Sequence, residues 1–308
     1  MKQSGDTAGW LPLPDWLRQL YPFEPKAFTC GRARMSYIDE GPRVDEAVLL
    51  LHGNPTWSFY YRDLVRSLVA DEWRCVAPDH IGMGLSDKPR DCPYRLATHI
   101  ENLAALVNYL DLRRVHLIVH DWGGPIGFGW AVQNPKKIGR IVILNTAAFP
   151  SPRIPLRINL CRTPLLGEWW IRGVNGFARP ATRMAMHRRP MSADAKRGYL
   201  FPYGSWASRI GIARFVADIP MRKDHPSWAT LEEIEGQLPR FRQNQIMIGW
   251  GGADFCFNQS FFDRWREILP LAETVFLPDA GHYVLEDARE EIIPRITAFL
   301  AGSAPIKM

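Results

Sequence analysis

Several familiar signatures are missing from this 308-residue chain. No apolar run approaches the roughly 18 residues that span a bilayer, and Met1–Trp10 contains Lys2 and Asp6 without the apolar stretch of an export signal. The five cysteines are scattered and show no CxxC spacing, which argues against a disulfide framework and against a zinc site. The sequence therefore predicts a cytoplasmic, reduced protein.

Motifs that hold phosphorylated cofactors are missing too. The glycine-containing loop of residues 78–86 lacks the lysine of a P-loop and the G-x-G-x-x-G spacing of a dinucleotide site. The two glycines after Trp250 fit a turn. We therefore expect neither a cofactor nor a metal ion.

The net charge of +6 is concentrated in one segment. Ser151–Pro226 holds 14 Lys or Arg against 4 Asp or Glu, a net +10, so the rest of the chain sums to −4. A nucleic-acid-binding segment would need stacking aromatics or a known motif among clustered charges, and adjacent basic pairs are few here. We expect no nucleic-acid partner. A solvated basic face is the plain interpretation of this segment, and a docking surface is the alternative.

Short apolar runs alternate with helical periodicity, as in the βαβ units of a parallel sheet. Helical spacing marks residues 96–110, 125–132 and 286–300. The alternation stops after Asn145–Thr146, where prolines, tryptophans and basic residues take over until about Trp228. We expect an α/β core of residues 1–146 and 229–308, with residues 147–228 inserted as a helical cap. The expected strands are Arg34–Ile38, Ala47–Leu51, Arg74–Ala77, Val115–Val119, Ile138–Leu144, Gln245–Trp250 and Glu273–Leu277.

Residues 115–124, VHLIVHDWGG, predict a buried strand that leads directly into a small-residue turn and a helix. This order is typical of a nucleophile elbow, in which a sharp turn exposes the reactive side chain. Asp121 occupies the position that is usually serine, and Val119 replaces the first glycine of the G-x-S-x-G pattern. An aspartate that merely caps the following helix is the alternative interpretation.

Further segments supply partners for Asp121. Asn54, in the HGNP sequence of residues 52–55, follows another strand, where such folds contribute an N–H group to an oxyanion hole. Asp254 and His282 each follow a later strand, in the chain order nucleophile, acid, histidine. Three other acids lie close to His282 in sequence and are better suited to surface or capping roles: Asp279, Glu286 and Asp287.

An aspartate nucleophile points to a particular kind of substrate. Its unperturbed pKa of about 3.9 keeps the carboxylate ionised at neutral pH, so no base is needed for the attack. Attack on an ester carbonyl would give a reactive anhydride, whereas displacement at a saturated carbon gives a stable alkyl ester. His282 is then free to activate water against that ester. The leaving group is a halide, the alkoxide of an epoxide or the carboxylate of a β-lactone.

The donors beside Asp121 narrow this choice. Trp122 carries an indole N–H group that can only donate, and Asn54 offers a second donor, a pair that favours a halide or a carboxylate. Simple packing is the alternative role of Trp122. An alkoxide needs proton donors, which the cap tyrosines Tyr199 and Tyr203 would offer. Apolar cap residues are candidates for an alkyl-binding slot or for cap core: Leu165, Leu166, Trp169, Trp170, Phe177, Trp206 and Phe215.

Four motifs resemble the haloalkane dehalogenase family of α/β-hydrolase-fold enzymes, and the resemblance spans nearly the whole chain. They are HGNPTW at 52–57, HIGMGLSDKP at 80–89, HDWGG at 120–124 and GHYVLED at 281–287. NTAAFP at 145–150, Ile219–Pro220 and the late acid Asp254 are similar to the third subfamily, which merges with the β-lactone decarboxylases of olefin biosynthesis. Another branch places its acid where this chain has Asn145.

The resemblance implies an α/β-hydrolase fold with Asp121, Asp254 and His282 as catalytic residues and Asn54 and Trp122 as stabilising groups. It implies that a cis-3-alkyl-4-alkyl β-lactone, made from two fatty acyl chains, becomes a cis-alkene and carbon dioxide. Haloalkane dehalogenation is the alternative, followed by epoxide hydrolysis and by a non-catalytic ligand receptor, because fold alone does not fix function. Such decarboxylases act beside the enzymes that build the lactone, so the basic cap is a candidate docking surface.

Overall fold

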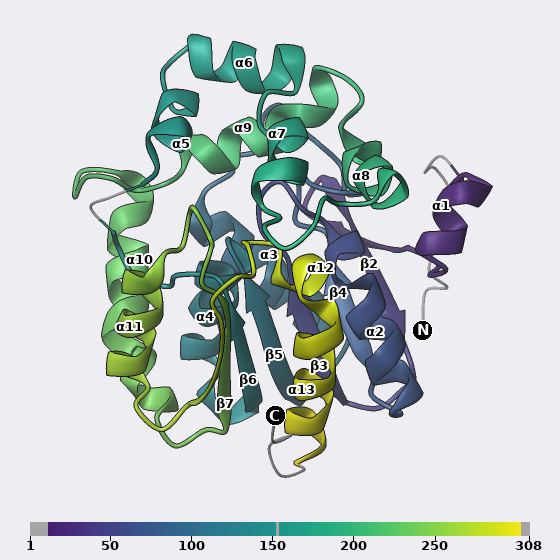
Figure 1. The fold of residues 1–308 in the computed structure, drawn as a ribbon, viewed down its shortest axis with the longest axis vertical. Helices are drawn as coiled ribbons and strands as arrows, with labels where there is room; N and C mark the ends of the chain where they lie inside the picture. The colour runs from purple at the N-terminus through teal and green to yellow at the C-terminus, as the bar shows by residue number, and fades with distance from the viewer. Residues whose placement is uncertain (1–11, 152–153, 303–308) are drawn as a thin grey trace.

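The computed structural model describes residues 12–151 and 154–302. Within them, eight strands form one sheet in the order β1-β2-β4-β3-β5-β6-β7-β8 (Figure 1). β1 pairs antiparallel with β2, and β2 with β4, while all the remaining neighbours are parallel. The strands are β1 (Lys26–Cys30), β2 (Ala33–Glu40), β3 (Glu46–Leu51), β4 (Cys75–Pro78), β5 (Arg114–His120), β6 (Ile138–Leu144), β7 (Ile246–Gly251) and β8 (Glu273–Leu277).

All seven strands expected from the sequence are present as β2 to β8. The sequence did not indicate β1, an edge strand in which no side chain is fully buried. Without a buried face, its residues carry no alternation of apolar and polar side chains to mark it. It is joined to β2 by a tight turn at Gly31, whose φ of 61° suits glycine.

Helices cover both faces of the sheet (Figure 1). α3, α4 and α10 pack together, and α2 packs against α13. The helix expected at 286–300 is interrupted at Ala288, which separates α12 from α13. The helices that lie outside residues 147–228 or, like α10, extend beyond them are α1 (Asp15–Leu20), α2 (Arg62–Ala70), α3 (Leu96–Tyr109), α4 (Gly123–Gln133), α10 (Pro226–Gln237), α11 (Gln259–Ile268), α12 (Val284–Asp287) and α13 (Arg289–Ala301).

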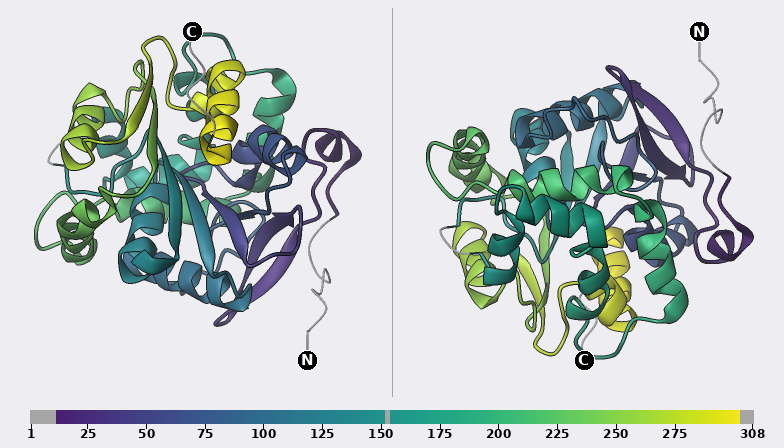
Figure 2. Two further views of the ribbon diagram at one scale, coloured as in Figure 1. Left: turned by 90° about the horizontal axis from the view of Figure 1, so that it is seen from below. Right: turned by 90° about the horizontal axis from the view of Figure 1, so that it is seen from above.

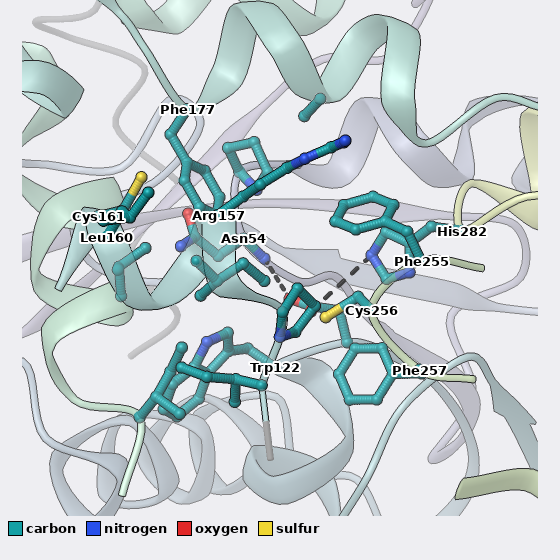
Figure 3. A pocket seen from close by; sticks show the side chains of 18 of the residues that line it. Asn54, Trp122, Arg157, Leu160, Cys161, Phe177, Phe255, Cys256, Phe257 and His282 are labelled. Atoms are coloured by element: carbon teal, nitrogen blue, oxygen red, sulfur yellow. Dashed lines mark hydrogen bonds and ion pairs between the residues drawn. The ribbon is translucent and has the colours of Figure 1, made fainter. Parts of the chain in front are cut away.

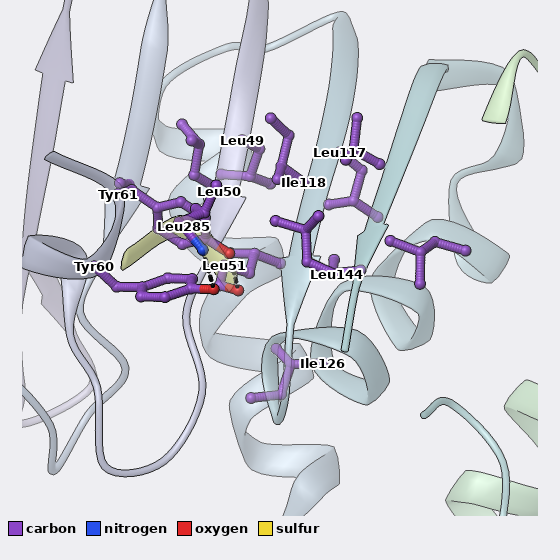
Figure 4. Packing of buried hydrophobic residues seen from close by; sticks show 14 of the residues in the cluster. Leu49, Leu50, Leu51, Tyr60, Tyr61, Leu117, Ile118, Ile126, Leu144 and Leu285 are labelled. Atoms are coloured by element: carbon purple, nitrogen blue, oxygen red, sulfur yellow. Dashed lines mark hydrogen bonds between the residues drawn. The ribbon is translucent and has the colours of Figure 1, made fainter. Parts of the chain in front are cut away.

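The core is densest around the central strands β3, β5 and β6. Leu50 on β3, Ile118 on β5 and Leu144 on β6 are completely buried, and Ile126 of α4 packs beneath them (Figure 4). Parallel strands with both faces covered read as continuous apolar runs, and this is why these strands were recognisable in the sequence. Because these strands are buried, their ends are held in place, and so are the first residues of the loops that follow them.

The loops after β3, β5 and β7 meet at one edge of the sheet, because parallel strands place their carboxyl ends together. Residues 147–228 are called here the cap segment, and the helices that it contains ahead of α10 lie over that edge (Figure 2). The α-helices among them are α5 (Leu156–Cys161), α6 (Leu166–Val174), α7 (Ala178–Met184), α8 (Ala193–Leu200) and α9 (Ile210–Ala217). No helix in the described ranges is long and apolar enough to cross a membrane.

Candidate active site

Asp121 lies at the turn between β5 and α4. Its φ of 50° is in the left-handed region, which is uncommon for a residue with a side chain and is typical of a strained elbow. Glycine is required just after it, because a Cβ on Gly123 would lie 1.9 Å from the carbonyl oxygen of Leu51. No side-chain hydrogen bond caps the start of α4. The geometry is therefore that of an elbow, not of a helix cap.

The Asp121 carboxylate is buried and held by main-chain donors. The N–H group of Asn54 donates to its Oδ1 at 2.6 Å. Burial raises the pKa of Asp121 above its usual value, while the charge of His282 and the N–H groups of Asn54 and Trp122 act in the opposite direction. These groups favour the charged form of the carboxylate and so oppose the effect of burial.

His282 stands between the two aspartates that the sequence paired with it. Its Nδ1 is 2.7 Å from Oδ2 of Asp254, and its Nε2 is 3.9 Å from Oδ2 of Asp121. Burial lowers the pKa of His282, but the charge and hydrogen bond of Asp254, together with Asp121, raise it above its usual value overall. The structure thus brings Asp121, Asp254 and His282 together in a line.

Asp254 is itself positioned by two donors. Nδ2 of Asn145 donates to Oδ2 of Asp254 at 3.0 Å, and the N–H group of Cys256 donates to Oδ1 at 2.6 Å. The Asn145 amide also makes two hydrogen bonds to the main chain of Gly251, which ties β6 to β7. Sequence reasoning noted Asn145 only as a missing acid, because its partners are distant in the chain.

The three rival acids are engaged elsewhere. Asp279 is exposed and pairs with Arg188 at 2.7 Å. Asp287 accepts hydrogen bonds from the N–H groups of Gly281 and His187. Glu286 forms a buried ion pair with Arg62 of α2. Asp279 and Asp287 connect the loop around His282 to the cap segment, Glu286 connects α12 to α2, and none of the three is hydrogen-bonded to the His282 ring.

Asn54 and Trp122, both labelled in Figure 3, line the same cavity as Asp121. One amide N–H group of Asn54 donates to the Ile212 carbonyl oxygen at 3.3 Å, which leaves its second N–H group for a ligand. The Trp122 ring packs edge-on against Phe215, with ring centroids 5.2 Å apart. Phe215 is cap core and supports Trp122 without lining the site itself.

A cavity of about 740 Å³ lies between the sheet edge and the cap segment, with Asp121 and His282 in its wall. Nearly all its other lining side chains are apolar. Leu166, Trp169, Trp170 and Phe177, expected either to bind alkyl groups or to form cap core, line it, whereas Leu165 and Trp206 do not. Arg157 contributes the only guanidinium among the described lining residues.

Sequence reasoning missed the loop that follows Asp254. Phe255, Cys256 and Phe257 line the cavity beside His282 (Figure 3), and Phe257 stacks on the His282 ring at 5.7 Å. These three residues directly follow the predicted catalytic acid in the sequence, and this position could have indicated that they lie at the site. Among the described residues, no group of His, Cys, Asp and Glu is arranged to hold a metal ion, and all five cysteines are free.

The two cap tyrosines lie away from the cavity. The Tyr203 hydroxyl donates to the Thr56 carbonyl oxygen and accepts from the N–H group of Gly84. Tyr199 is buried against Phe59 and stacks on Tyr283. Neither tyrosine lines the cavity, so neither phenol is placed to protonate an alkoxide there.

The sheet order, the elbow after β5 and the inserted cap define the class, and the chain belongs to the α/β hydrolase fold family, whose model matches residues 46–288. It is 44% identical to a cis-3-alkyl-4-alkyloxetan-2-one decarboxylase of Xanthomonas campestris pv. campestris, over 91% of this chain and 97% of the relative. It is 33% identical to haloalkane dehalogenase 2 of Mycobacterium tuberculosis, over 90% of this chain and 95% of the relative. These relatives confirm the resemblance inferred from the motifs.

A solved structure supports the same fold. The haloalkane dehalogenase of Bradyrhizobium elkani superposes with a TM-score of 0.81 at 24% identity, covering 91% of this chain and 98% of the other. Both groups of relatives are enzymes, and this chain is more similar in sequence to the decarboxylase than to the dehalogenases.

Proposed function

We propose that this protein is a cis-3-alkyl-4-alkyl β-lactone (oxetan-2-one) decarboxylase, which forms a cis-alkene and carbon dioxide in long-chain olefin biosynthesis. One observation carries the proposal: a buried carboxylate, Asp121, faces an apolar cavity of about 740 Å³ and is backed by His282. Similarity to the Xanthomonas decarboxylase over nearly the full length of both chains supports it. Catalysis is assigned to Asp121, Asp254 and His282.

In the first step Asp121 attacks the ring carbon C4, which bears the ring oxygen. Its Oδ1 accepts the Asn54 N–H group, so Oδ2 is the attacking atom. The new C4–Oδ2 bond forms while the C4–O bond of the lactone breaks, and the electron pair leaves with the oxygen. The product is an alkyl ester of Asp121 that carries a free carboxylate on C3.

In the second step the C3–carboxylate bond breaks and carbon dioxide leaves. The electron pair of the broken C3–carboxylate bond becomes the second bond between C3 and C4. The C4–Oδ2 bond breaks at the same time, and its electron pair regenerates the Asp121 carboxylate. Attack from the back of the ring places Asp121 anti to the departing carboxylate, so no rotation about C3–C4 is needed. The alkyl groups keep their relation, and a cis-lactone gives a cis-alkene. No water is consumed.

Asn54, Trp122 and His282 act on the carboxylate released in the first step. The free amide N–H group of Asn54 and the indole N–H group of Trp122 donate to it. Asp254 keeps the pKa of His282 raised, which favours the positively charged form of the imidazole beside the two carboxylates. The site therefore stabilises negative charge where the ring opens.

Haloalkane dehalogenation is the second candidate, because the same two donors suit a halide and because dehalogenases share the fold. In that reaction His282 would activate water against the Asp121 ester. Tyr199 and Tyr203, the tyrosines expected to protonate an alkoxide, do not line the cavity, so they lend no support to epoxide hydrolysis. The non-catalytic receptor is disfavoured by the pairing of His282 with Asp254 at 2.7 Å, an arrangement that binding alone does not require.

The division of the chain belongs to the same proposal. We assign residues 1–146 and 229–308 to the catalytic core and residues 147–228 to the cap. Part of the cap's basic charge is used internally, since Arg188 pairs with Asp279 and Glu291, and Arg189 with Glu290. A small apolar substrate, assembly with lactone-forming enzymes through the remaining basic residues, a cytoplasmic location and independence of cofactors all remain predictions.

The test offers the purified protein a cis-3,4-dialkyl β-lactone and, separately, a 1-bromoalkane. Alkene, carbon dioxide and bromide are measured. We expect alkene and carbon dioxide in equal amounts from the lactone. Bromide release without alkene would replace the proposal with dehalogenation, and neither product would refute both.

Two variants test the mechanism. Asp121→Asn should abolish turnover, with mass spectrometry used to exclude hydrolysis of the amide back to aspartate. His282→Ala should retain measurable alkene formation in a decarboxylase, whereas a dehalogenase would accumulate an alkyl ester on Asp121 that appears as added mass. Asp279→Asn is the matched control, because this exposed acid contacts Arg188 and lies outside the cavity. A wild-type rate in verified Asp121→Asn protein would refute the nucleophile.

A further inference from the structure

The outer surface of the cap is unusually apolar. Six large side chains there are between 49% and 84% exposed, on α5 and α6 or at the start of α6. Isolated exposed apolar residues are common, but a cluster of this kind indicates an interaction surface. α6 is the element farthest from the sheet in Figure 1. We call these residues the cap-top patch: Leu156, Leu160, Leu165, Leu166, Trp169 and Trp170.

Leu165 is the most exposed member, at 84%, and it is presented by an unfavourable backbone. Its φ of 63° and ψ of −57° are those of the strained γ-turn, and the Leu166 N–H group donates to the Pro164 carbonyl oxygen at 2.7 Å. Glycine would adopt this conformation with less strain. A leucine at this position raises an apolar side chain to the tip of the cap at a cost in stability.

The patch is continuous with the cavity. Leu160, Leu166, Trp169 and Trp170 are exposed and also line the cavity that contains Asp121. They therefore form the rim of its opening. An apolar molecule that lies against the patch is therefore in contact with side chains that continue into the cavity.

Cationic side chains flank this rim. Arg179 and Arg183 are exposed on α7, next to Pro180 and Met184, which line the same cavity. Neither arginine has a carboxylate partner among the described residues. The segment 151–226 carries a net +10 while the rest of the chain sums to −4. An anionic surface would therefore attract the cap and repel the core, and so orient the molecule.

We propose that the cap-top patch docks onto an anionic phospholipid bilayer. Its leucine and tryptophan side chains enter the boundary between headgroups and acyl chains, and Arg179 and Arg183 bind lipid phosphates. The cavity then opens into the bilayer, where a molecule with two long alkyl chains partitions. Only this delivery of substrate rests on the proposed function. The docking itself rests on the exposed apolar and basic residues.

Co-sedimentation with vesicles tests the docking without any substrate. Wild-type protein should bind vesicles of phosphatidylglycerol and phosphatidylethanolamine, bind phosphatidylcholine vesicles weakly, and lose affinity as salt rises. Arg179→Gln with Arg183→Gln should weaken binding by about thirtyfold, from about 1 kcal/mol for each cation at the surface. Leu156→Gln with Leu165→Gly should weaken it about tenfold or more. None of these four residues lines the cavity.

Matched substitutions on the core serve as controls. Leu271→Gln removes a leucine that is 73% exposed, and Arg32→Gln with Arg90→Gln removes two exposed cations. Both should bind vesicles like the wild type. Equal binding by cap and core variants would overturn the proposal, as would the absence of vesicle binding. Concentration-dependent oligomers that Leu156→Gln with Leu165→Gly abolishes, without vesicle binding, would assign the patch to a second copy of the chain or to a protein partner.

The failure of this proposal is separable from failure of the proposed function. Asp121→Asn protein should bind vesicles like the wild type although it is inactive. The patch variants should turn over lactone dispersed in detergent at the wild-type rate. Loss of turnover in detergent by the patch variants would contradict a role limited to docking.

Discussion

Gly53 in the loop after β3 offers a sharp test of how the Asp121 carboxylate is positioned. Its backbone φ lies outside the left-handed region, so alanine causes no backbone strain there, and only space decides the outcome. A Cβ at this position would lie 2.2 Å from both Cβ and Oδ1 of Asp121. Ordinary carbon contacts lie at about 3.5 Å or more, so the carboxylate must move by about 1.3 Å.

The size of that displacement determines how much catalytic rate and stability the variant should lose. A misplacement of about 1 Å at a reacting group costs on the order of 100-fold in rate, which is about 2.7 kcal/mol of transition-state stabilisation. The overpacking itself should lower the free energy of unfolding by about 1–3 kcal/mol. We therefore expect Gly53→Ala to fold, to bind substrate, and to form alkene with kcat reduced by about two orders of magnitude.

The assay combines alkene formation with denaturant unfolding. Gly236→Ala in α10 is the matched control, because no atom lies within 4 Å of the added Cβ and alanine favours a helix by about 1 kcal/mol over glycine. It should keep the wild-type kcat with equal or higher stability. Gly53→Ala protein that is folded and turns over at the wild-type rate would refute the positioning of Asp121 by this loop.

Two further predictions concern the partners of His282. Asn145→Ala removes the donor to Asp254 and leaves main-chain groups of Gly251 without partners. It should lower the free energy of unfolding by about 2 kcal/mol and shift the pH profile of activity. An unchanged pH profile would limit Asn145 to a structural role. Because the pKa of Asp121 is raised, alkene formation should fall at acid pH as the carboxylate takes up a proton. It should not rise when His282 deprotonates at its raised pKa, and an alkaline rise measured by alkene release would indicate that His282 acts as a base.

The site was predictable where chemistry-bearing residues follow buried strands. Asn54, Asp121 and Asp254 each come just after a strand that is apolar enough to recognise, and parallel pairing brings those strand ends to one edge. The prediction that His282 joins them rests on the chain order nucleophile, acid, histidine, in which each residue follows a strand. The distances between these residues do not follow from the sequence. The sequence favoured Asp254 over Asp279 and Glu286, and the ion pairs that engage these two rivals support that choice.

The cap was less predictable, for a physical reason. Apolar side chains in a helical insertion satisfy the same pattern whether they face a core, a cavity or solvent. Phe215 and Trp170 look alike in the sequence, yet the structure buries Phe215 beneath Trp122 and places Trp170 on the rim of the cavity. The positions of the Tyr199 and Tyr203 hydroxyl groups were likewise not predictable. They depend on which helices pack together, and the sequence does not show this.

Decarboxylation and dehalogenation share their first step on Asp121 and diverge at the ester. Hydrolysis needs a water molecule between His282 and the ester, whereas elimination needs only a carboxylate on the neighbouring carbon, which a lactone supplies by opening. The phenyl rings of Phe255 and Phe257 lie beside His282 and cover part of its surroundings with apolar side chains. A β-lactone carries its own leaving carboxylate into the site, so decarboxylation, unlike hydrolysis, does not depend on a water molecule held between His282 and the ester.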